Sequence, residues 1–242
     1  MTHSTSRAVA LVAVALLFTT GAACTRQAPE ASPEPHESAP TEPDYTVIGD
    51  VHRRSPGRWA VTAFGDREAP LAVLEVPDGF QAVQSWVWTD EYGPRQFGQL
   101  SYAVPTRVPA DPCDPAGSKL PVGQSPHDLA AALTAQQRTL HSSTSPIELN
   151  GRRGVYLEIR TPRRRTGSGC SAEDAFVLWE AGGDDDRGLG PGDLERLWIL
   201  DVDGRRVVVS ALTPRHGDPE TAALLTGLVE DIEFVDPEQV DS

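Results

Sequence analysis

The sequence has few of the residues from which a biochemical activity is usually inferred. Its 242 residues include only 3 cysteines and 1 methionine, and Lys119 is its single lysine. It has no C-x-x-C pair, no H-E-x-x-H or G-x-S-x-G sequence and no phosphate-binding glycine loop, and its 6 histidines are scattered. We therefore expect no cofactor and no metal site, and the sequence names no set of catalytic residues.

Long hydrophobic runs are also rare, and the one present lies near the N-terminus. Residues 8–18 are eleven apolar residues in a row, with Arg7 before them and no acidic residue in 1–7. As a helix they would rise about 16 Å, roughly half of a hydrocarbon core, which is too short for a transmembrane helix. The pattern predicts an export signal.

This signal ends in small residues followed by a cysteine. Ala22-Ala23-Cys24 resembles the lipobox of bacterial lipoproteins, in which the cysteine receives the lipid, although Gly21 stands where that family usually has Leu, Val or Ile. The resemblance implies a signal peptide over residues 1–23 and lipidation of Cys24. The protein would then be extracytoplasmic, held on the outer face of the cytoplasmic membrane by its lipid anchor alone. A secretory signal cleaved near Ala23 and an uncleaved anchor are the alternatives.

Proline and acidic residues dominate the segment after this cysteine. Residues 25–44 hold five prolines, five acidic residues and one arginine, so we expect residues 24–44 to form a disordered tether. Removing residues 1–23 takes one arginine from the formal net charge of −14 and leaves −15. Such a charge disfavours nucleic acid as a partner and gives no attraction to anionic lipid headgroups.

Residues 45–242 are long enough for one domain with a sizeable core, and their pattern predicts an α+β fold. Helices are expected after Ser125 and after Asp218, because each of these residues can cap a helix and is followed by proline. The first helix should carry Leu129 and Leu140 on one face. We expect a mostly antiparallel β-sheet flanked by helices. Strands are expected at residues 59–64, 71–76, 82–89, 97–108, 146–149, 155–161, 175–179, 197–201, 207–212 and 232–235, with hairpin turns at 150–151 and 203–204.

Three stretches are similar to PsbP-like proteins. They are LAVLEVPDGF, IELNGRRGVYLEIRT and the ending DGRRVVVSALTP with ALLTGLVEDIEF. This fold is shared by extrinsic photosystem subunits and by lipoproteins of mycobacteria and their relatives, including LpqN-type lipoproteins. The resemblance covers about residues 70–236 and implies an antiparallel sheet between helices, closed by a terminal helix and strand. Its members mostly act as binding or assembly factors, and no functional residues can be carried over to this chain.

Two cysteines lie within the expected domain. Cys113 and Cys170 have no metal-ligand spacing, and outside the cytoplasm such a pair predicts a disulfide. Closing a loop of about 58 residues would stabilise the fold by roughly 4 kcal/mol in the chain-entropy model. Two free buried thiols and a redox function are the alternatives.

Two charged runs are candidate sites. Arg163, Arg164 and Arg165 form a candidate anion or partner patch, since arginine binds carboxylate and phosphate bidentately, and a hydrated loop is the alternative. Residues 182–193 cluster carboxylates that suit Ca²⁺, but Leu189 stands where a calcium loop needs its turn glycine. We therefore interpret residues 182–193 as a solvated, flexible loop.

Two tryptophans of one expected strand share a face. Trp86 and Trp88 have the same parity, which favours either core packing under a helix or an aromatic groove.

The sequence leaves two classes of function open. The favoured one is a non-catalytic, lipid-anchored extracytoplasmic binding or accessory domain, which would recognise an envelope protein, a peptidoglycan fragment or a small amphiphile. The alternative is a cell-envelope hydrolase whose site is assembled from loops. A nucleic-acid partner is not expected.

Overall fold

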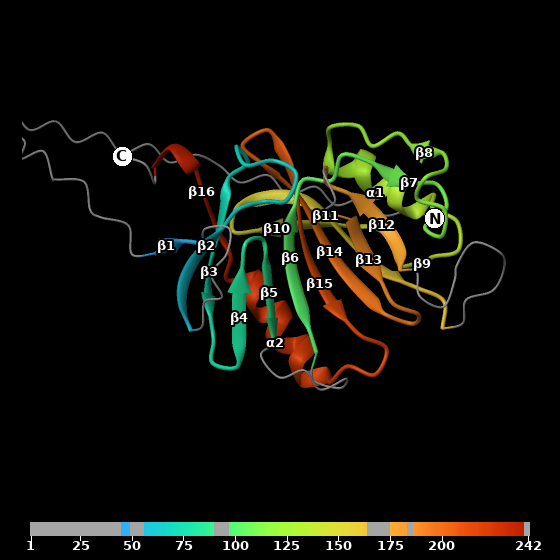
Figure 1. Ribbon diagram of the computed structural model, residues 1–242. Coiled ribbons are helices and arrows are strands. Elements are labelled where there is room, and N and C mark those ends of the chain that lie inside the picture. Colours follow the sequence, from blue (N-terminus) through green and yellow to red (C-terminus); the bar gives the residue numbers. More distant parts are fainter. Residues whose placement is uncertain (1–44, 49–55, 90–96, 164–174, 183–185, 240–242) are drawn as a thin grey trace, which may run out of the picture. The chain divides into compact units, whose positions relative to one another are not determined.

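The computed structural model describes five segments of the chain, residues 45–48, 56–89, 97–163, 175–182 and 186–239 (Figure 1). Its contacts divide the chain into two units, residues 1–41 and 42–242, and every described residue belongs to the second unit. The expected signal peptide, the lipidation site Cys24 and the tether lie outside the described residues, so they stay predictions.

Strands form most of the described unit, and two helices accompany them. The smaller sheet has the strand order β1–β2–β3–β16, and the larger has the order β10–β11–β14–β15–β6–β5–β4, with β9 also pairing with β11. The pairs β12–β13 and β7–β8 stand apart from both sheets. The pairings between these strands are antiparallel, except that β1 runs parallel to β2. The elements are β1 (Thr46–Val47), β2 (Gly57–Val61), β3 (Leu71–Val76), β4 (Phe80–Val83), β5 (Trp86–Thr89), β6 (Gln99–Ala103), β7 (Val108–Pro109), β8 (Lys119–Leu120), α1 (Pro126–Thr134), β9 (Leu140–His141), β10 (Ser145–Leu149), β11 (Arg152–Arg160), β12 (Phe176–Glu180), β13 (Asp186–Leu189), β14 (Leu194–Val202), β15 (Arg205–Thr213), α2 (Pro219–Glu230), β16 (Glu233–Val235) and the 3₁₀ turn η1 (Pro237–Gln239).

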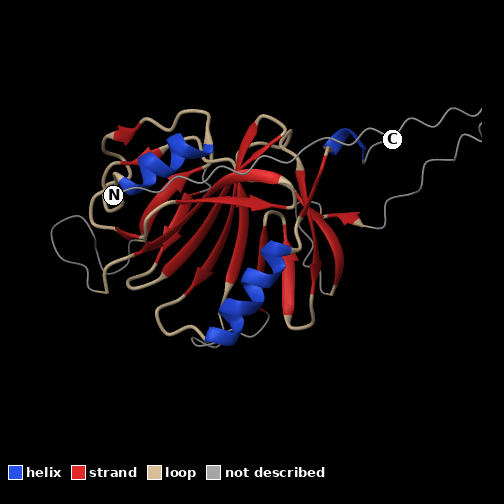
Figure 2. Ribbon diagram, turned by 180° about the vertical axis from the view of Figure 1, so that it is seen from behind, coloured by secondary structure: helices blue, strands red, loops and turns tan. Residues whose placement is uncertain are grey.

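The large sheet is buried on both faces, because successive side chains of a strand point to opposite sides. On β14, Trp198 belongs to the core on the α2 side, whereas its neighbours Leu197 and Ile199 belong to the core on the α1 side. Figure 2 shows α2 lying across one face of this sheet. We call this side the α2 face. The opposite side, covered by α1 and by β12, we call the α1 face.

The two long hairpins follow the predicted turns. Asn150 and Gly151 connect β10 to β11, and Asp203 and Gly204 connect β14 to β15. All four residues have positive φ, between 47° and 82°, which is the left-handed conformation that Asn-Gly and Asp-Gly turns supply.

Both helices begin where the capping residues predict. Ser125 accepts a hydrogen bond from the backbone N–H of Asp128, and Asp218 accepts one from the backbone N–H of Glu220. The first helix is shorter than predicted, because α1 ends at Thr134 and Leu140 lies instead on the edge strand β9, 63% exposed. In the described residues, no helix has the length and apolarity that crossing a membrane would require.

The strand predicted over residues 82–89 is wrong, because the chain reverses there. Val83 pairs directly with Trp86, so β4 and β5 form a hairpin around Gln84. Gln84 has a φ of 51° without being a glycine or an asparagine, which is why the turn was not recognised. Trp86 and Trp88 do share a face, and the intervening Val87 is buried in the α2-side core.

The solvated loop predicted over residues 182–193 is also wrong in part. Asp186 to Leu189 form β13, which pairs with β12, and Arg187 on this strand is buried. Arg187 binds Glu195, a carboxylate that follows this segment on β14. A side chain that forms a buried ion pair explains why this polar segment is ordered as a strand.

Candidate functional site

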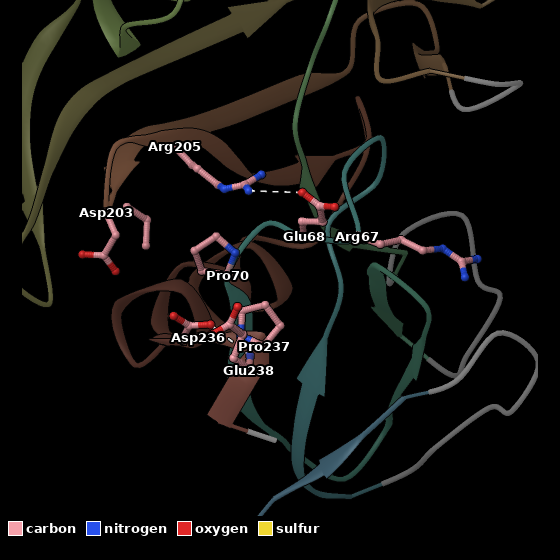
Figure 3. Close-up of a pocket in the computed structure, with 9 residues that line it drawn as sticks. Arg67, Glu68, Pro70, Asp203, Arg205, Asp236, Pro237 and Glu238 are labelled. Atoms are coloured by element: carbon pink, nitrogen blue, oxygen red, sulfur yellow. Dashed lines mark hydrogen bonds and ion pairs between the residues drawn. The ribbon is translucent and has the colours of Figure 1, made fainter. Parts of the chain in front are cut away.

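Two surface hollows of nearly equal size lie at the end of the large sheet where β10 turns into β11 and β14 into β15. The first, about 550 Å³, we call the junction hollow, and the second, about 540 Å³, we call the β10 hollow. A third, of about 360 Å³, lies at residues 62–67. The junction hollow is lined by Arg67, Glu68, Pro70, Val202, Asp203, Arg205, Asp236, Pro237 and Glu238 (Figure 3). The β10 hollow is lined by Pro126, His127, Pro146, Ile147, Glu148, Arg153, Gly154 and Asp201.

In the junction hollow, the chain's own charges are largely paired with each other. Arg205 binds Asp66 at 2.6 Å and reaches Glu68 at 3.5 Å, a contact drawn in Figure 3. Asp203 binds Arg152 at 2.5 Å. These pairs connect the loop before β3 with the two hairpin turns, so we interpret the junction hollow as a structural junction.

The floor of the β10 hollow is a row of alternating charges on the α1 face. Glu148 on β10 lies directly opposite Arg153 on β11. Gly154 pairs with Leu200, so the preceding Arg153 lies opposite Asp201, which follows Leu200 on β14. Neighbouring strands are about 4.8 Å apart, so the guanidinium stands between two carboxylates within reach of one ligand.

These three charges are not paired with one another. Glu148, Arg153 and Asp201 are all exposed. None of the ion pairs among the described residues includes any of them. Asp201 accepts one hydrogen bond, from the backbone N–H of Gly204 at 2.8 Å. The charged floor of the β10 hollow is therefore available to a ligand.

The row ends at Arg206, which holds the loop in front of α1. Arg206 lies opposite Asp201 on β15 and donates to the carbonyls of Pro105 at 2.5 Å and Val122 at 3.0 Å, and also to that of Gly123. Burial lowers the pKa of its guanidinium, and the charge of Asp128 opposes that shift. Two of these bonds hold Val122 and Gly123, which lie just before the N-cap of α1, against the sheet.

The first turn of α1 forms one wall of the β10 hollow, and the helix cap holds this turn in place. Asp128 accepts hydrogen bonds from the backbone N–H of Ser125 at 3.0 Å and from its hydroxyl at 2.8 Å. These bonds lower the pKa of the Asp128 carboxyl. The capping box holds Pro126 and His127, in the first turn, over the sheet. This wall is therefore ordered without a ligand.

Gly154, among the residues of the β10 hollow, packs closely against the neighbouring strand β14. A Cβ on Gly154 would stand 2.0 Å from the carbonyl oxygen of Ile199 on the neighbouring strand. Such an approach is impossible without moving the backbone, so only glycine fits at this position of β11. Pro126 and Pro146 give the hollow apolar surface, whereas the side chain of Ile147 packs against the α2-side core.

A second polar cluster on the α1 face is closed to ligands. The Arg187 guanidinium donates from Nε and Nη2 to the two carboxylate oxygens of Glu195, each at 2.8 Å, and from Nη1 to Gln99 at 2.7 Å. It also lies 5.1 Å from the ring centre of Trp86. The side chains of Arg187 and Glu195 are only 4% and 0% exposed. Burial raises the pKa of Glu195, and the charge of Arg187 and a hydrogen bond from Ser210 oppose that shift.

The described histidines do not form a catalytic pair. His127 lines the β10 hollow, while His141 and His216 are exposed elsewhere. Among the hydrogen bonds of the described segments, none joins a histidine to a hydroxyl, thiol or carboxylate side chain; His141 contacts only the Ser142 carbonyl oxygen. In the same segments, no group of three or more His, Cys, Asp or Glu residues is placed to hold a metal ion.

The residues singled out from the sequence lie away from the β10 hollow. Cys113 is buried, and its expected partner Cys170 lies outside the described residues, so the disulfide stays a prediction. Arg163 is exposed just after β11, while Arg164 and Arg165 lie outside the described residues. The patch they were expected to form also stays a prediction.

Sequence reasoning missed Glu148, Arg153 and Asp201 as a group. The register of the two predicted hairpins is the feature of the sequence that could have shown that these three residues are neighbours. Asn150-Gly151 sets Glu148 opposite Arg153, but only the pairing of β11 with β14 brings Asp201 beside them.

No family model matches this sequence, and no curated protein matches it. Among solved structures, the chain is similar to cyanobacterial PsbP (CyanoP) from Synechocystis sp. PCC 6803, known from a solution structure. The identity is 14%, the match covers 77% of this chain and 94% of that chain, and the TM-score is 0.31.

Proposed function

We propose that this protein is a lipid-anchored, extracytoplasmic binding or accessory domain of the PsbP-like type, and that it holds a small amphiphile in the β10 hollow without catalysing a reaction. The lipobox-like ending at Cys24 and the acidic, proline-rich segment after it support the location. The closing of the domain by α2 and β16 is the arrangement expected of a PsbP-like protein.

The observation that carries the proposal is the composition of the β10 hollow. Small-molecule sites are concave, mostly apolar and about 300–1,000 Å³ in volume, with a few charged or polar groups that orient the ligand. The β10 hollow combines apolar walls with unpaired charges at about 540 Å³. An alkyl chain would lie against Pro126 and Pro146, and a polar headgroup would reach Arg153 and its neighbours.

Binding is favoured over hydrolysis by the residues that line this hollow. The described lining contains no serine, threonine or cysteine, and its one histidine, His127, has no hydrogen-bonded nucleophile. The hydroxyls of Ser101 and Ser210 are buried against each other at 2.5 Å. No arrangement in the described part of the chain supports the hydrolase alternative.

The binding proposal is tested with ten-carbon probes. Residues 24–242, produced without lipid, would be titrated calorimetrically with decanoate, decylammonium and 2-aminodecanoate below their micellar concentrations. We expect saturable binding of at least one probe. Pro146→Asp, which places a charge in the apolar wall, should weaken that binding at least tenfold, whereas Leu140→Asp on the exposed strand β9 should leave it unchanged. Equal effects of the two substitutions would remove the β10 hollow from the proposal.

The location is tested on the protein made by its own cells. We expect the N-terminal peptide to begin at Cys24 and to carry the mass of acyl chains, and Cys24→Ala to release the protein from the membrane fraction. Alkylation without reductant should leave Cys113 and Cys170 unlabelled, as a disulfide in an oxidising compartment requires. An unmodified Cys24 thiol, or two labelled domain cysteines, would contradict these expectations.

A further inference from the structure

The charge pattern of the β10 hollow restricts which headgroup can bind there. Arg153 stands between Glu148 and Asp201 across three neighbouring strands. All three side chains are exposed and line the same hollow, and no ion pair among the described residues joins them. Free positive and free negative charge therefore lie within one strand spacing of each other.

A headgroup with a single charge fits this row poorly. An anion bound to Arg153 would lie close to the carboxylates on either side, and a cation bound to Glu148 or Asp201 would lie close to the guanidinium. In each case the attraction to one side chain is offset by repulsion from its neighbour. A headgroup that carries both charges meets opposite charges at both of its ends.

The other arginines beside this row, Arg152 and Arg206, are bound by groups of the chain itself, unlike Arg153. Arg152, the residue before Arg153 on β11, points to the α2 face and binds Asp203. Arg206, at the end of the row, is held by backbone carbonyls. The guanidinium of Arg153 is thus left for a ligand, and His127, which lines the same hollow, carries ring nitrogens that can also form a hydrogen bond.

We propose that the β10 hollow is a zwitterion site, which binds an ammonium group at Glu148 or Asp201 together with a carboxylate or phosphate group at Arg153. The proposal rests on the proposed function and names the chemistry of its ligand. The apolar walls at Pro126 and Pro146 take the hydrocarbon part of the same molecule. Amino acids with long side chains and lipids with a phosphoethanolamine headgroup share this chemistry.

The test compares probes that differ only in charge. Residues 24–242 without lipid would be titrated with 2-aminodecanoate, decanoate and decylammonium, and with an eight-carbon lysophosphatidylethanolamine to represent the lipid source. We expect at least one zwitterion to bind at least tenfold more tightly than either singly charged probe. The tighter of the two zwitterions identifies the anion as carboxylate or phosphate.

Substitutions locate the preference. Arg153→Gln should reduce zwitterion binding about tenfold and bring it to the level of the singly charged probes. The double variant Glu148→Gln with Asp201→Asn, which removes both possible partners of the ammonium group, should do the same. Arg152→Gln, one residue away on the opposite face, is the matched control and should preserve the preference. Far-ultraviolet circular dichroism of each variant confirms that it is folded.

Two results would overturn the zwitterion site. The first would leave the proposed amphiphile binding intact, and the second would contradict it as well. If decanoate or decylammonium binds as tightly as both zwitterions, with Pro146→Asp still weakening it, the hollow binds amphiphiles but not through paired charges. If none of the four probes binds, or if Arg152→Gln abolishes the preference as Arg153→Gln does, the β10 hollow is not the site.

Discussion

Arg187 on β13 and Arg153 on β11 both lie on the α1 face of the large sheet, and each has a carboxylate beside it, but only Arg187 forms a closed ion pair. Arg187 is buried and grips Glu195 with two hydrogen bonds. Arg153 is exposed between Glu148 and Asp201 and pairs with neither. Both regions combine a guanidinium with carboxylates, but these groups are buried around Arg187 and exposed around Arg153.

This difference separates a structural role from a binding role. A charge taken out of water must be fully paired, and breaking a buried pair is costly. An exposed charge contributes little to stability, so it can be left unpaired for a ligand. The junction hollow is an intermediate case, because Arg205 is partly exposed and yet paired with Asp66 and Glu68. Substitutions in the three regions should therefore differ in size and in kind.

The largest effect is expected from breaking the buried pair. Glu195→Leu leaves the charge of Arg187 buried without a partner and should lower the free energy of unfolding by about 3–5 kcal/mol. The double variant Arg187→Met with Glu195→Leu removes both charges and should recover most of that loss. Urea unfolding measures all variants. A double variant as unstable as the sum of the two single ones would show that the pair does not act as a unit.

A smaller effect is expected at the junction hollow. Arg205→Ala removes two partly exposed ion pairs and should cost about 1 kcal/mol or less, since such pairs are individually worth about 0.2–1 kcal/mol. Added salt should shrink this difference further. Urea unfolding at low and high salt checks it, and a salt-independent loss of several kcal/mol would place Arg205 with the buried pair instead.

The smallest effect on stability is expected at Arg153. Arg153→Gln removes no ion pair and should change the free energy of unfolding by less than about 0.5 kcal/mol, although it should weaken zwitterion binding about tenfold. Urea unfolding and calorimetry on the same preparation give both values. A clear loss of stability would mean that Arg153 supports the sheet and is not kept for a ligand.

The local rules of the sequence predicted the parts of this fold that depend on neighbouring residues. Ser125 and Asp218 marked both helix starts, and Asn150-Gly151 and Asp203-Gly204 marked both long hairpins. The mostly antiparallel sheet followed from these elements.

Features that depend on distant partners were missed. The β4–β5 turn uses Gln84, a residue that does not signal a turn, and β13 is ordered by a pair between Arg187 and Glu195 that only the fold brings together. The charged row of the β10 hollow depends in the same way on the register between β11 and β14. The sequence alone therefore pointed to a class of domain but not to its candidate site.

The claim that the β10 hollow is the binding site is tested most directly by a residue-resolved titration. Two-dimensional amide nuclear magnetic resonance spectra of residues 24–242, recorded with increasing 2-aminodecanoate, report which backbone groups sense the ligand. We expect the shifts to cluster at His127, Ile147, Glu148, Arg153 and Gly154 and to saturate with one affinity. Shifts at Glu68, Asp203 and Arg205 in the junction hollow, or no saturable shifts at all, would contradict the account.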